Sequence, residues 1–328
     1  MISTLDINKL LKLLNAISPF NQAEDWDNVG LMVGDPGQKV RGILLALDPT
    51  EVLLAECRIR NCNTVITHHP LIFHPLKNIR TDHPPGRLLA TALKHEINVI
   101  ACHTNLDALV GGVSDILAQR LGLINLQPLQ PLHSPQPSQR LQSWSPTASS
   151  SSTASTNCPG FGRIGELTNP MAGETFLVKL LDTLDLEAAP VAGPLPTMVN
   201  RVAVCGGSGS DFAERARQTS ADIYVSAEIK HAVARWAETH DFCVVDVGHY
   251  PSENPMIAQL AQLLTSELAS AGFHDIPVRI SRQQRNPFRL FYRDQIKHPR
   301  YDNSDQRSGF SHNPLSHPLT RNPYEAPT

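Results

Sequence analysis

Long apolar runs and a secretory leader are both missing from this sequence. A membrane-spanning helix needs about eighteen consecutive apolar residues, and no stretch of this sequence approaches that length. The first residues lack the basic segment and apolar core of a signal peptide, and a helical pattern follows them instead. With 41% apolar and 18% charged residues, the chain is also not typical of a disordered protein. We therefore expect a folded protein without a membrane span.

A basic excess and closely paired cysteines are missing as well. The formal net charge is −3, which argues against a general nucleic-acid-binding protein. The cysteines form no Cys-x-x-Cys pair, and four of them lie in or beside apolar runs, as small core residues do. They are Cys57, Cys62, Cys102, Cys158, Cys205 and Cys243. This usage fits the reducing cytosol, so we expect a cytoplasmic protein.

Several catalytic signatures are absent too. There is no Gly-x-Ser-x-Gly elbow, and no cysteine has an obvious basic partner nearby, so a nucleophilic serine or cysteine has little support. The Asp-x-His and Gly-Asn-His strings of binuclear metallophosphatases are also missing. A glycine-rich segment after an expected strand is neither a Walker A motif nor a Gly-x-Gly-x-x-Gly fingerprint. We interpret Gly206, Gly207, Ser208 and Gly209 either as a tight strand-to-helix turn or as a turn whose N–H groups hold a phosphate.

What is present is an alternation of short strands with helices, which is typical of an α/β fold. We expect strands at 42–47, 64–67, 99–102, 201–205, 222–225, 242–247 and 278–280. We expect helices at 7–17, 51–60, 87–95, 113–121, 173–184, 212–219, 229–240 and 254–271.

Composition divides the chain into two α/β segments, 1–126 and 161–290. Between them, residues 127–160 are rich in Pro and Ser and contain the run TASSSSTAST. Such a stretch cannot bury enough apolar surface to fold alone, so we interpret it as a disordered, flexible linker or surface insertion. Residues 291–328 are polar and contain many prolines, and we expect a mostly disordered tail there.

Polar clusters follow three of the expected strands. They contain imidazoles and carboxylates: His68, His69, His103, Asp107, His249 and Glu253. Because the carboxyl ends of parallel strands gather at one edge of a sheet, these distant clusters can converge. Imidazole and carboxylate together suit zinc, iron or manganese. A lone histidine at a strand end is usually an ordinary polar residue, but this repeated pattern is much harder to obtain by chance.

Spacing suggests a role for each ligand. Adjacent side chains on an extended segment point to opposite sides, so His68 and His69 are better placed to hold two ions, one each, than to chelate one ion together. Glu253 lies four residues after His249, where its carboxylate can bridge both ions while His249 binds one of them. Asp107 would complete the shell of the other ion. Five ligands for two ions leave positions open for water or substrate, which is typical of a catalytic site.

Two further histidines are candidates for proton transfer. His103 can act as a ligand, as a hydrogen-bonding partner of a ligand, or as a proton shuttle. His231, in the string EIKH, is a candidate for lining the site. The string WDNVGL at 26–31 reads as a loop segment that either sets a turn or lines a pocket.

A set of longer strings occurs here in the order known from one protein family. They are WDNVGLMVG (26–34), THHPLIF (67–73), PLKNI (75–79), HTNLDALVGGVSDILA (103–118), GRIGEL (162–167), RVAVCGGSGSDF (201–212), AEIKH (227–231), GHYPSE (248–253) and NPF (286–288). In these strings the chain resembles the Nif-three-like family, whose members are often labelled GTP cyclohydrolase 1 type 2 homologues. The resemblance covers most of residues 5–290.

The resemblance implies two α/β lobes with mixed sheets flanked by helices, and a ring-shaped hexamer built from dimers. It also implies a dinuclear metal site at His68, His69, Asp107, His249 and Glu253. The larger bacterial members carry a folded domain between the halves, where this chain has only the Ser/Pro-rich segment.

The activity that the resemblance implies is GTP cyclohydrolysis, in which a metal-activated water attacks C8 of the guanine ring. The triphosphate would then rest near Gly206–Gly209, and His103 or His231 would transfer protons. Our leading hypothesis is therefore a metal-dependent hydrolase with two divalent ions (zinc, iron or manganese), acting on a nucleotide or a related small molecule.

Two other classes of function compete with this hypothesis. In one, the protein is a non-catalytic metal-binding regulatory scaffold that acts on protein partners through its linker and tail. In the other, DNA passes through the central hole of the ring, which the acidic composition disfavours.

Overall fold

The computed structural model describes residues 4–132 and 158–291, and the described residues up to Pro287 form one compact unit. Most of the predicted linker (133–157) and nearly all of the predicted tail (292–328) lie outside the described residues. None of the helices within the described part is both long and apolar enough to cross a bilayer.

The first of two sheets has the strand order β1-β4-β3-β2-β11. Its strands are β1 (Gly30–Val33), β2 (Ile43–Ala46), β3 (Thr64–Thr67), β4 (Asn98–Ala101) and β11 (Val278–Ile280). All neighbours are parallel except β1, which runs antiparallel to β4. β2, β3 and β4 are buried at every position because helices cover both faces of the sheet. Thr67 pairs with Ala101, so β3 and β4 end at the same level.

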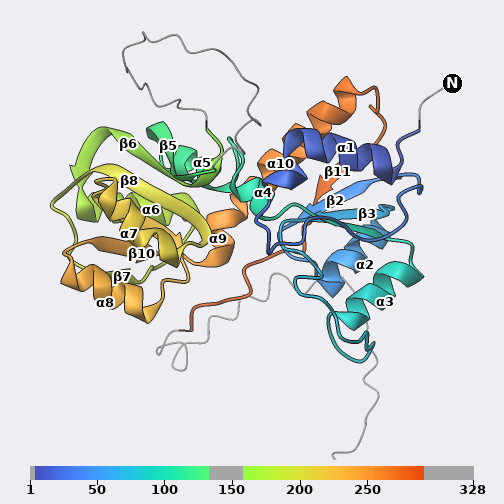
Figure 1. Cartoon of the computed structure of the whole chain (residues 1–328), viewed down its shortest axis with the longest axis horizontal. Helices are drawn as coiled ribbons and strands as arrows, with labels where there is room; N and C mark the ends of the chain where they lie inside the picture. Colours follow the sequence, from blue (N-terminus) through green and yellow to red (C-terminus); the bar gives the residue numbers. More distant parts are fainter. Residues whose placement is uncertain (1–3, 133–157, 292–328) are drawn as a thin grey trace, which may run out of the picture. The chain divides into compact units, whose positions relative to one another are not determined.

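Helices lie on both faces of this sheet (Figure 1). On one face, α1 (Ile7–Ile17) and α10 (Pro255–Ser270) pack against Ile43, Leu45 and Ile66. On the other, α2 (Glu51–Ile59) and α3 (Gly86–Lys94) pack against Leu44 and Val65. The α1 helix starts where predicted, because the Asp6 side chain accepts a hydrogen bond from the backbone N–H of Lys9.

The second sheet has the order β5-β6-β8-β9-β10-β7 and mixes parallel with antiparallel pairs. Its strands are β5 (Leu123–Pro131), β6 (Gly160–Ala172), β7 (Val191–Ala192), β8 (Met198–Ser208), β9 (Ile223–Ala227) and β10 (Cys243–Asp246). Its helices are α5 (Val113–Arg120) and α6 (Gly173–Leu184) on one face, with α7 (Ala213–Gln218) and α8 (His231–Thr239) on the other. The remaining short elements are η1 (Phe20–Gln22), α4 (Thr104–Asp107), η2 (Ser210–Phe212) and α9 (His249–Glu253).

The predicted fold class is confirmed, with two mixed sheets flanked by helices, but the end of the second segment belongs elsewhere. Within 161–290, β11 joins the first sheet beside β2, and α10 packs on α1. Leu260 and Leu264 of α10 are fully buried in the core of the first sheet. Periodicity identified this strand and helix correctly, but it carries no information on which sheet they join.

Two loop assignments also differ from the structure. Residues 127–131, which we placed in the linker, form the second half of β5, where Leu129 is fully buried. The prolines in this half are tolerated because β5 is an edge strand. Gly30 and Leu31, placed in a loop, begin β1. The second half of β5 could not be predicted from the sequence because of its prolines, and β1 could not because it is short.

Candidate metal centre

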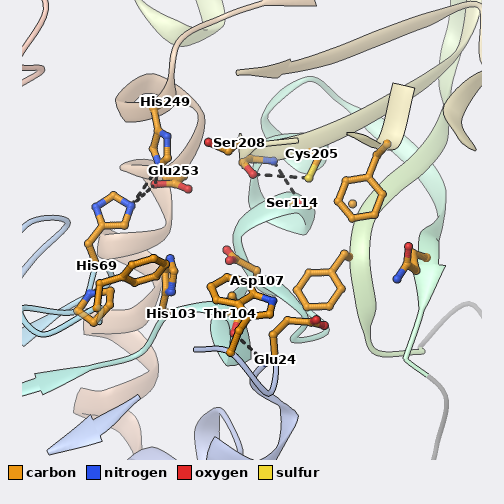
Figure 2. A pocket seen from close by; sticks show the side chains of 18 residues that line it. Glu24, His69, His103, Thr104, Asp107, Ser114, Cys205, Ser208, His249 and Glu253 are labelled. Carbon is orange, nitrogen blue, oxygen red and sulfur yellow. Dashed lines mark hydrogen bonds and ion pairs between the residues drawn. The ribbon is translucent and has the colours of Figure 1, made fainter. Parts of the chain in front are cut away.

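The predicted ligands come together at the ends of their strands. His68 and His69 follow β3 directly, and the parallel neighbour β4 leads through His103 into α4, whose last residue is Asp107. His249 and Glu253 are the first and last residues of α9, four positions apart, so both side chains lie on one face. Figure 2 shows His69 and His249 directed towards Glu253.

The ligand atoms divide into two sets that share Glu253. His68 Nε2 lies 3.5 Å from Asp107 Oδ1 and 3.7 Å from Glu253 Oε1. His69 Nε2 and His249 Nε2 lie 3.1 and 3.0 Å from Glu253 Oε2, and 3.1 Å from each other. Each set is compact enough to surround one ion. A third compact set joins His68 and His69 with His103, so the adjacent histidines are closer together than simple alternation suggested.

Each imidazole is held by its other nitrogen. His68 Nδ1 donates to the Cys102 carbonyl at 2.9 Å, His69 Nδ1 to Asp48 at 2.7 Å, and His249 Nδ1 to Glu228 at 2.9 Å. A carbonyl only accepts, so Nδ1 of His68 carries a proton, and Nε2 is the nitrogen that can offer a lone pair to a metal. Such outer hydrogen bonds orient imidazoles that bind metals and make them more basic.

Three buried atoms at the centre make no hydrogen bond: His68 Nε2, Asp107 Oδ1 and Glu253 Oε2. Leaving such atoms without partners costs about 1–3 kcal/mol each, and more for charged groups. His68 and Glu253 are only 1% and 4% exposed, so bulk water does not compensate them. Buried donor atoms gathered into two compact sets fit bound cations, and the mixture of imidazole and carboxylate fits zinc, iron or manganese.

The charge balance at the centre also favours a cation. Burial alone lowers the pKa of an imidazole, yet Asp48 and Glu253 raise the pKa of His69 to about 10. Burial is likewise outweighed at His249, where Glu253 and Glu228 raise the pKa to about 9. Burial would raise the pKa of Glu253, but the surrounding histidines hold it well below its usual value. The carboxylates therefore hold positive charge at this point even when no metal is bound.

His103 is fixed beside the centre by Asp27. Its Nδ1 donates to Asp27 Oδ1 at 2.8 Å, and Thr104 donates to the other oxygen of that carboxylate. Burial works against ionisation of Asp27, but these hydrogen bonds lower its pKa to about 2. The carboxylate therefore stays charged and leaves Nε2 of His103 free. Asp27 belongs to the string whose role was left open, and it anchors this histidine.

The glycine segment is not the predicted strand-to-helix turn, because Gly206, Gly207 and Ser208 are the last residues of β8. The Gly206 N–H donates to Ser114 Oγ and the Gly207 N–H to Ser252 Oγ. These groups are therefore already engaged, and phosphate binding at Gly206–Gly209 stays a prediction. A Cβ on Gly207 would lie 2.1 Å from Glu253 Oε1, so this glycine makes room for the shared ligand.

A cavity of about 540 Å³ opens beside the centre and reaches His69, His103, Asp107, His249 and Glu253. This volume lies in the range of small-molecule sites. Cys205 also lines it, but burial raises the pKa of its thiol to about 12, so the thiol is not a nucleophile near neutral pH.

His231 is the predicted site residue that the structure does not bring to the cavity. It is exposed at the first position of α8, and it is not among the residues that line the cavity. Its role in proton transfer stays a prediction without support from the geometry. The residues that sequence reasoning missed are Asp48 and Glu228, which hold two ligand rings. Asp48 directly follows an expected strand, and Glu228 lies in the family string AEIKH, so each had a signal in the sequence.

Comparison with known proteins finds relatives that match nearly all of the described chain. A chain from Clostridium perfringens named GTP cyclohydrolase 1 type 2 homolog is 30% identical over 285 residues, covering 87% of this chain and 99% of the relative. A Bacillus subtilis protein of the same name is 27% identical, with 88% and 99% covered.

Solved structures with the same fold include Staphylococcus aureus protein SA1388, with a TM-score of 0.76, 28% identity, and 88% and 99% of the two chains covered. A Bacillus cereus protein related to NIF3 gives a TM-score of 0.77 at 25% identity, with 88% and 100% covered. The model of the Duf34/NIF3 (NGG1p interacting factor 3) family matches residues 5–287. The chain therefore belongs to the Duf34/NIF3 family, as its motifs predicted.

Proposed function

We propose that the protein is a hydrolase that uses two divalent metal ions to activate water against a nucleotide-related small molecule. The observation that carries this proposal is the pair of ligand sets sharing Glu253, with His68 Nε2 and Asp107 Oδ1 buried and without a hydrogen bond. The name GTP cyclohydrolase 1 type 2 homolog, borne by relatives about 30% identical, supports a ring-opening hydrolysis.

Each ligand has a defined task. His68, Asp107 and Glu253 would hold one ion in the buried set, while His69, His249 and Glu253 would hold the other beside the cavity. When bound, such ions act as Lewis acids and lower the pKa of water towards about 7. Zinc, iron and manganese all suit this ligand set.

His103 is placed to move the proton that the reaction releases. It lines the cavity, and the ionised Asp27 holds its Nδ1–H, so Nε2 can accept a proton from water or substrate. Asp27 also stabilises the imidazolium that forms. The reaction therefore needs both His103 and Asp27, although neither belongs to the two ligand sets that share Glu253.

Metal content tests the first half of the proposal. Mass spectrometry on gently purified wild type should find about two ions per chain, one for each of the two proposed ligand sets. His68→Ala and Glu253→Gln should both lower this number, while Glu238→Gln, an exposed change on α8, should not. A wild-type protein that contains no metal and takes up no zinc, manganese or iron would overturn the proposal.

Activity separates hydrolysis from the scaffold alternative. Glu253→Gln should abolish release of hydrolysis products from nucleotides, nucleosides or pterins, and its thermal unfolding should remain cooperative. His103→Asn should lower turnover by about a hundredfold or more while metal content is kept. If wild type with two ions turns over none of these compounds, and its binding to protein partners survives metal removal, the scaffold function is the correct one.

A further inference from the structure

Building on the proposed hydrolase function, we propose that the substrate is a planar, amino-substituted heteroaromatic molecule, at the level of a base or nucleoside and without a polyphosphate. The cavity offers ring surfaces and an unpaired carboxylate, and none of the described residues that line it is lysine or arginine. A nucleoside triphosphate, which the family resemblance implies, is the wrong charge for these surroundings.

Aromatic rings from both sheets line the cavity. Trp26 and Phe73, from loops of the first sheet, meet edge to face with ring centroids 5.8 Å apart. Phe161 of β6 and Phe212 of η2 stack with centroids 6.5 Å apart and planes 19° from parallel. Trp26 also meets His103 edge to face and is 58% exposed, so much of its ring surface remains open to a ligand. Such faces bind planar ligands by stacking, whichever heteroaromatic ring is present.

The charge around the cavity is negative. Six carboxylates line it or hold its imidazoles: Glu24, Asp27, Asp48, Asp107, Glu228 and Glu253. Among the described residues that line it, none is lysine or arginine. Two divalent cations would still leave these surroundings net negative, even with His103 protonated. A polyphosphate would therefore meet like charge and no guanidinium or ammonium partner.

Glu24 is the lining residue that would select the ligand. Its backbone N–H donates to Thr104 Oγ1, which fixes the segment beside the centre. Its carboxylate has no hydrogen bond or ion pair within the described part of the chain, although it faces the cavity. A free carboxylate accepts hydrogen bonds, so it matches ring N–H and exocyclic amino groups. Gln130 adds an amide, and Ser114 adds a hydroxyl.

Titration calorimetry on the zinc-loaded full chain tests this inference. The probes are guanosine, adenosine and pterin, each compared at fixed salt with GTP and ATP. At least one uncharged probe should bind about tenfold or more tightly than the triphosphates, because like charges across a binding surface disfavour association. Zinc content is measured after each titration, so that a triphosphate that merely extracts the metal is recognised.

Two variants with matched controls assign the binding to this cavity. Trp26→Leu should lower the affinity for the bound probe about fivefold or more, because stacking is lost. Trp236→Leu on α8 should leave the affinity unchanged. Glu24→Gln should weaken it about tenfold, while loss of the neighbouring exposed charge in Asp25→Asn should have little effect. Glu24→Gln should also reduce the difference in binding affinity between the nucleoside and the triphosphate.

The inference is overturned if the triphosphates bind more tightly with zinc retained, if no uncharged probe binds, or if both variants bind like wild type. These outcomes are separate from failure of the hydrolase function. Turnover of tightly bound GTP would support hydrolysis and overturn the inference. Tight nucleoside binding without turnover would support the inference and overturn hydrolysis.

Discussion

At the residue scale, the two carboxylates behind the imidazoles differ in their surroundings. Each accepts a second hydrogen bond, Asp48 from Gln284 and Glu228 from Ser208, but the Asp48 side chain is 36% exposed and the Glu228 side chain 60%. A better-held carboxylate orients its imidazole more firmly and loses less of its effect to solvent. We therefore expect His69 to depend on Asp48 more than His249 depends on Glu228.

Replacing these carboxylates should lower metal affinity to different extents. Asp48→Ala should weaken zinc binding about ten- to a hundredfold, since the imidazole loses its orienting partner, and Glu228→Ala should weaken it less. Competition with a chromophoric chelator measures both affinities, with Asp25→Ala as the control for loss of a nearby charge. Equal affinities in wild type and Asp48→Ala would contradict the role assigned to Asp48.

Gly207 is required for two physical reasons at one position. Its φ of +69° disfavours any side chain, and a Cβ would collide with Glu253 Oε1. Gly111 has a similar φ of +79° with nothing within 4 Å of a Cβ, so it isolates the backbone effect.

Gly207→Ala and Gly111→Ala should therefore behave differently. Each should destabilise the fold by about 1–2 kcal/mol through backbone strain. Gly207→Ala alone should also lower the bound metal per chain, because the collision displaces the shared ligand. Mass spectrometry of metal content and urea unfolding separate the two effects, and full metal loading in Gly207→Ala would show that Glu253 can move aside freely.

At the scale of elements, Glu56 of α2 joins β11 and the residues after it to the first sheet. Its carboxylate accepts hydrogen bonds from Ser281 Oγ, from the Arg282 N–H and from Arg60. Burial by itself raises the pKa of Glu56, but these donors together lower it below the usual value of 4.5. The folded state therefore binds the proton of Glu56 less tightly than the unfolded chain does.

This difference predicts a pH-dependent contribution to stability. Because the folded pKa is the lower one, the stabilisation is complete above the unfolded value of 4.5 and disappears as the pH falls through the folded pKa. Glu56→Gln should cost about 1–3 kcal/mol at pH 7, and this cost should shrink below pH 4.5. Urea unfolding of both proteins at pH 7, 5 and 4 checks it, and a cost that is constant with pH would contradict it.

At the scale of the whole molecule, the family resemblance predicts a ring-shaped hexamer. Light scattering after size exclusion should then give six times the chain mass of 36.0 kDa. The mass should not change with salt if the contacts between subunits are mainly apolar, because screening weakens only charge interactions. A chain that remains monomeric at micromolar concentration would contradict the hexamer and leave the cavity complete within one subunit.

The sequence by itself determined the candidate ligands and most of the secondary structure. His68, His69, Asp107, His249 and Glu253 could be selected because polar groups directly after apolar strands are a local pattern. Helix α1 could be placed to the residue, because its cap and apolar stripe are also local. The family could also be predicted from the sequence, because its strings are recognised by their residues and by their order along the chain.

Only the tertiary structure decided which of these local pieces meet. It assigned β11 to the first sheet, divided the ligands into sets sharing Glu253, and placed Asp48 and Glu228 behind the imidazoles. It also excluded His231 from the cavity that the aromatic rings line. These features depend on pairing and burial between residues far apart in the chain, and periodicity along one segment carries no record of such contacts.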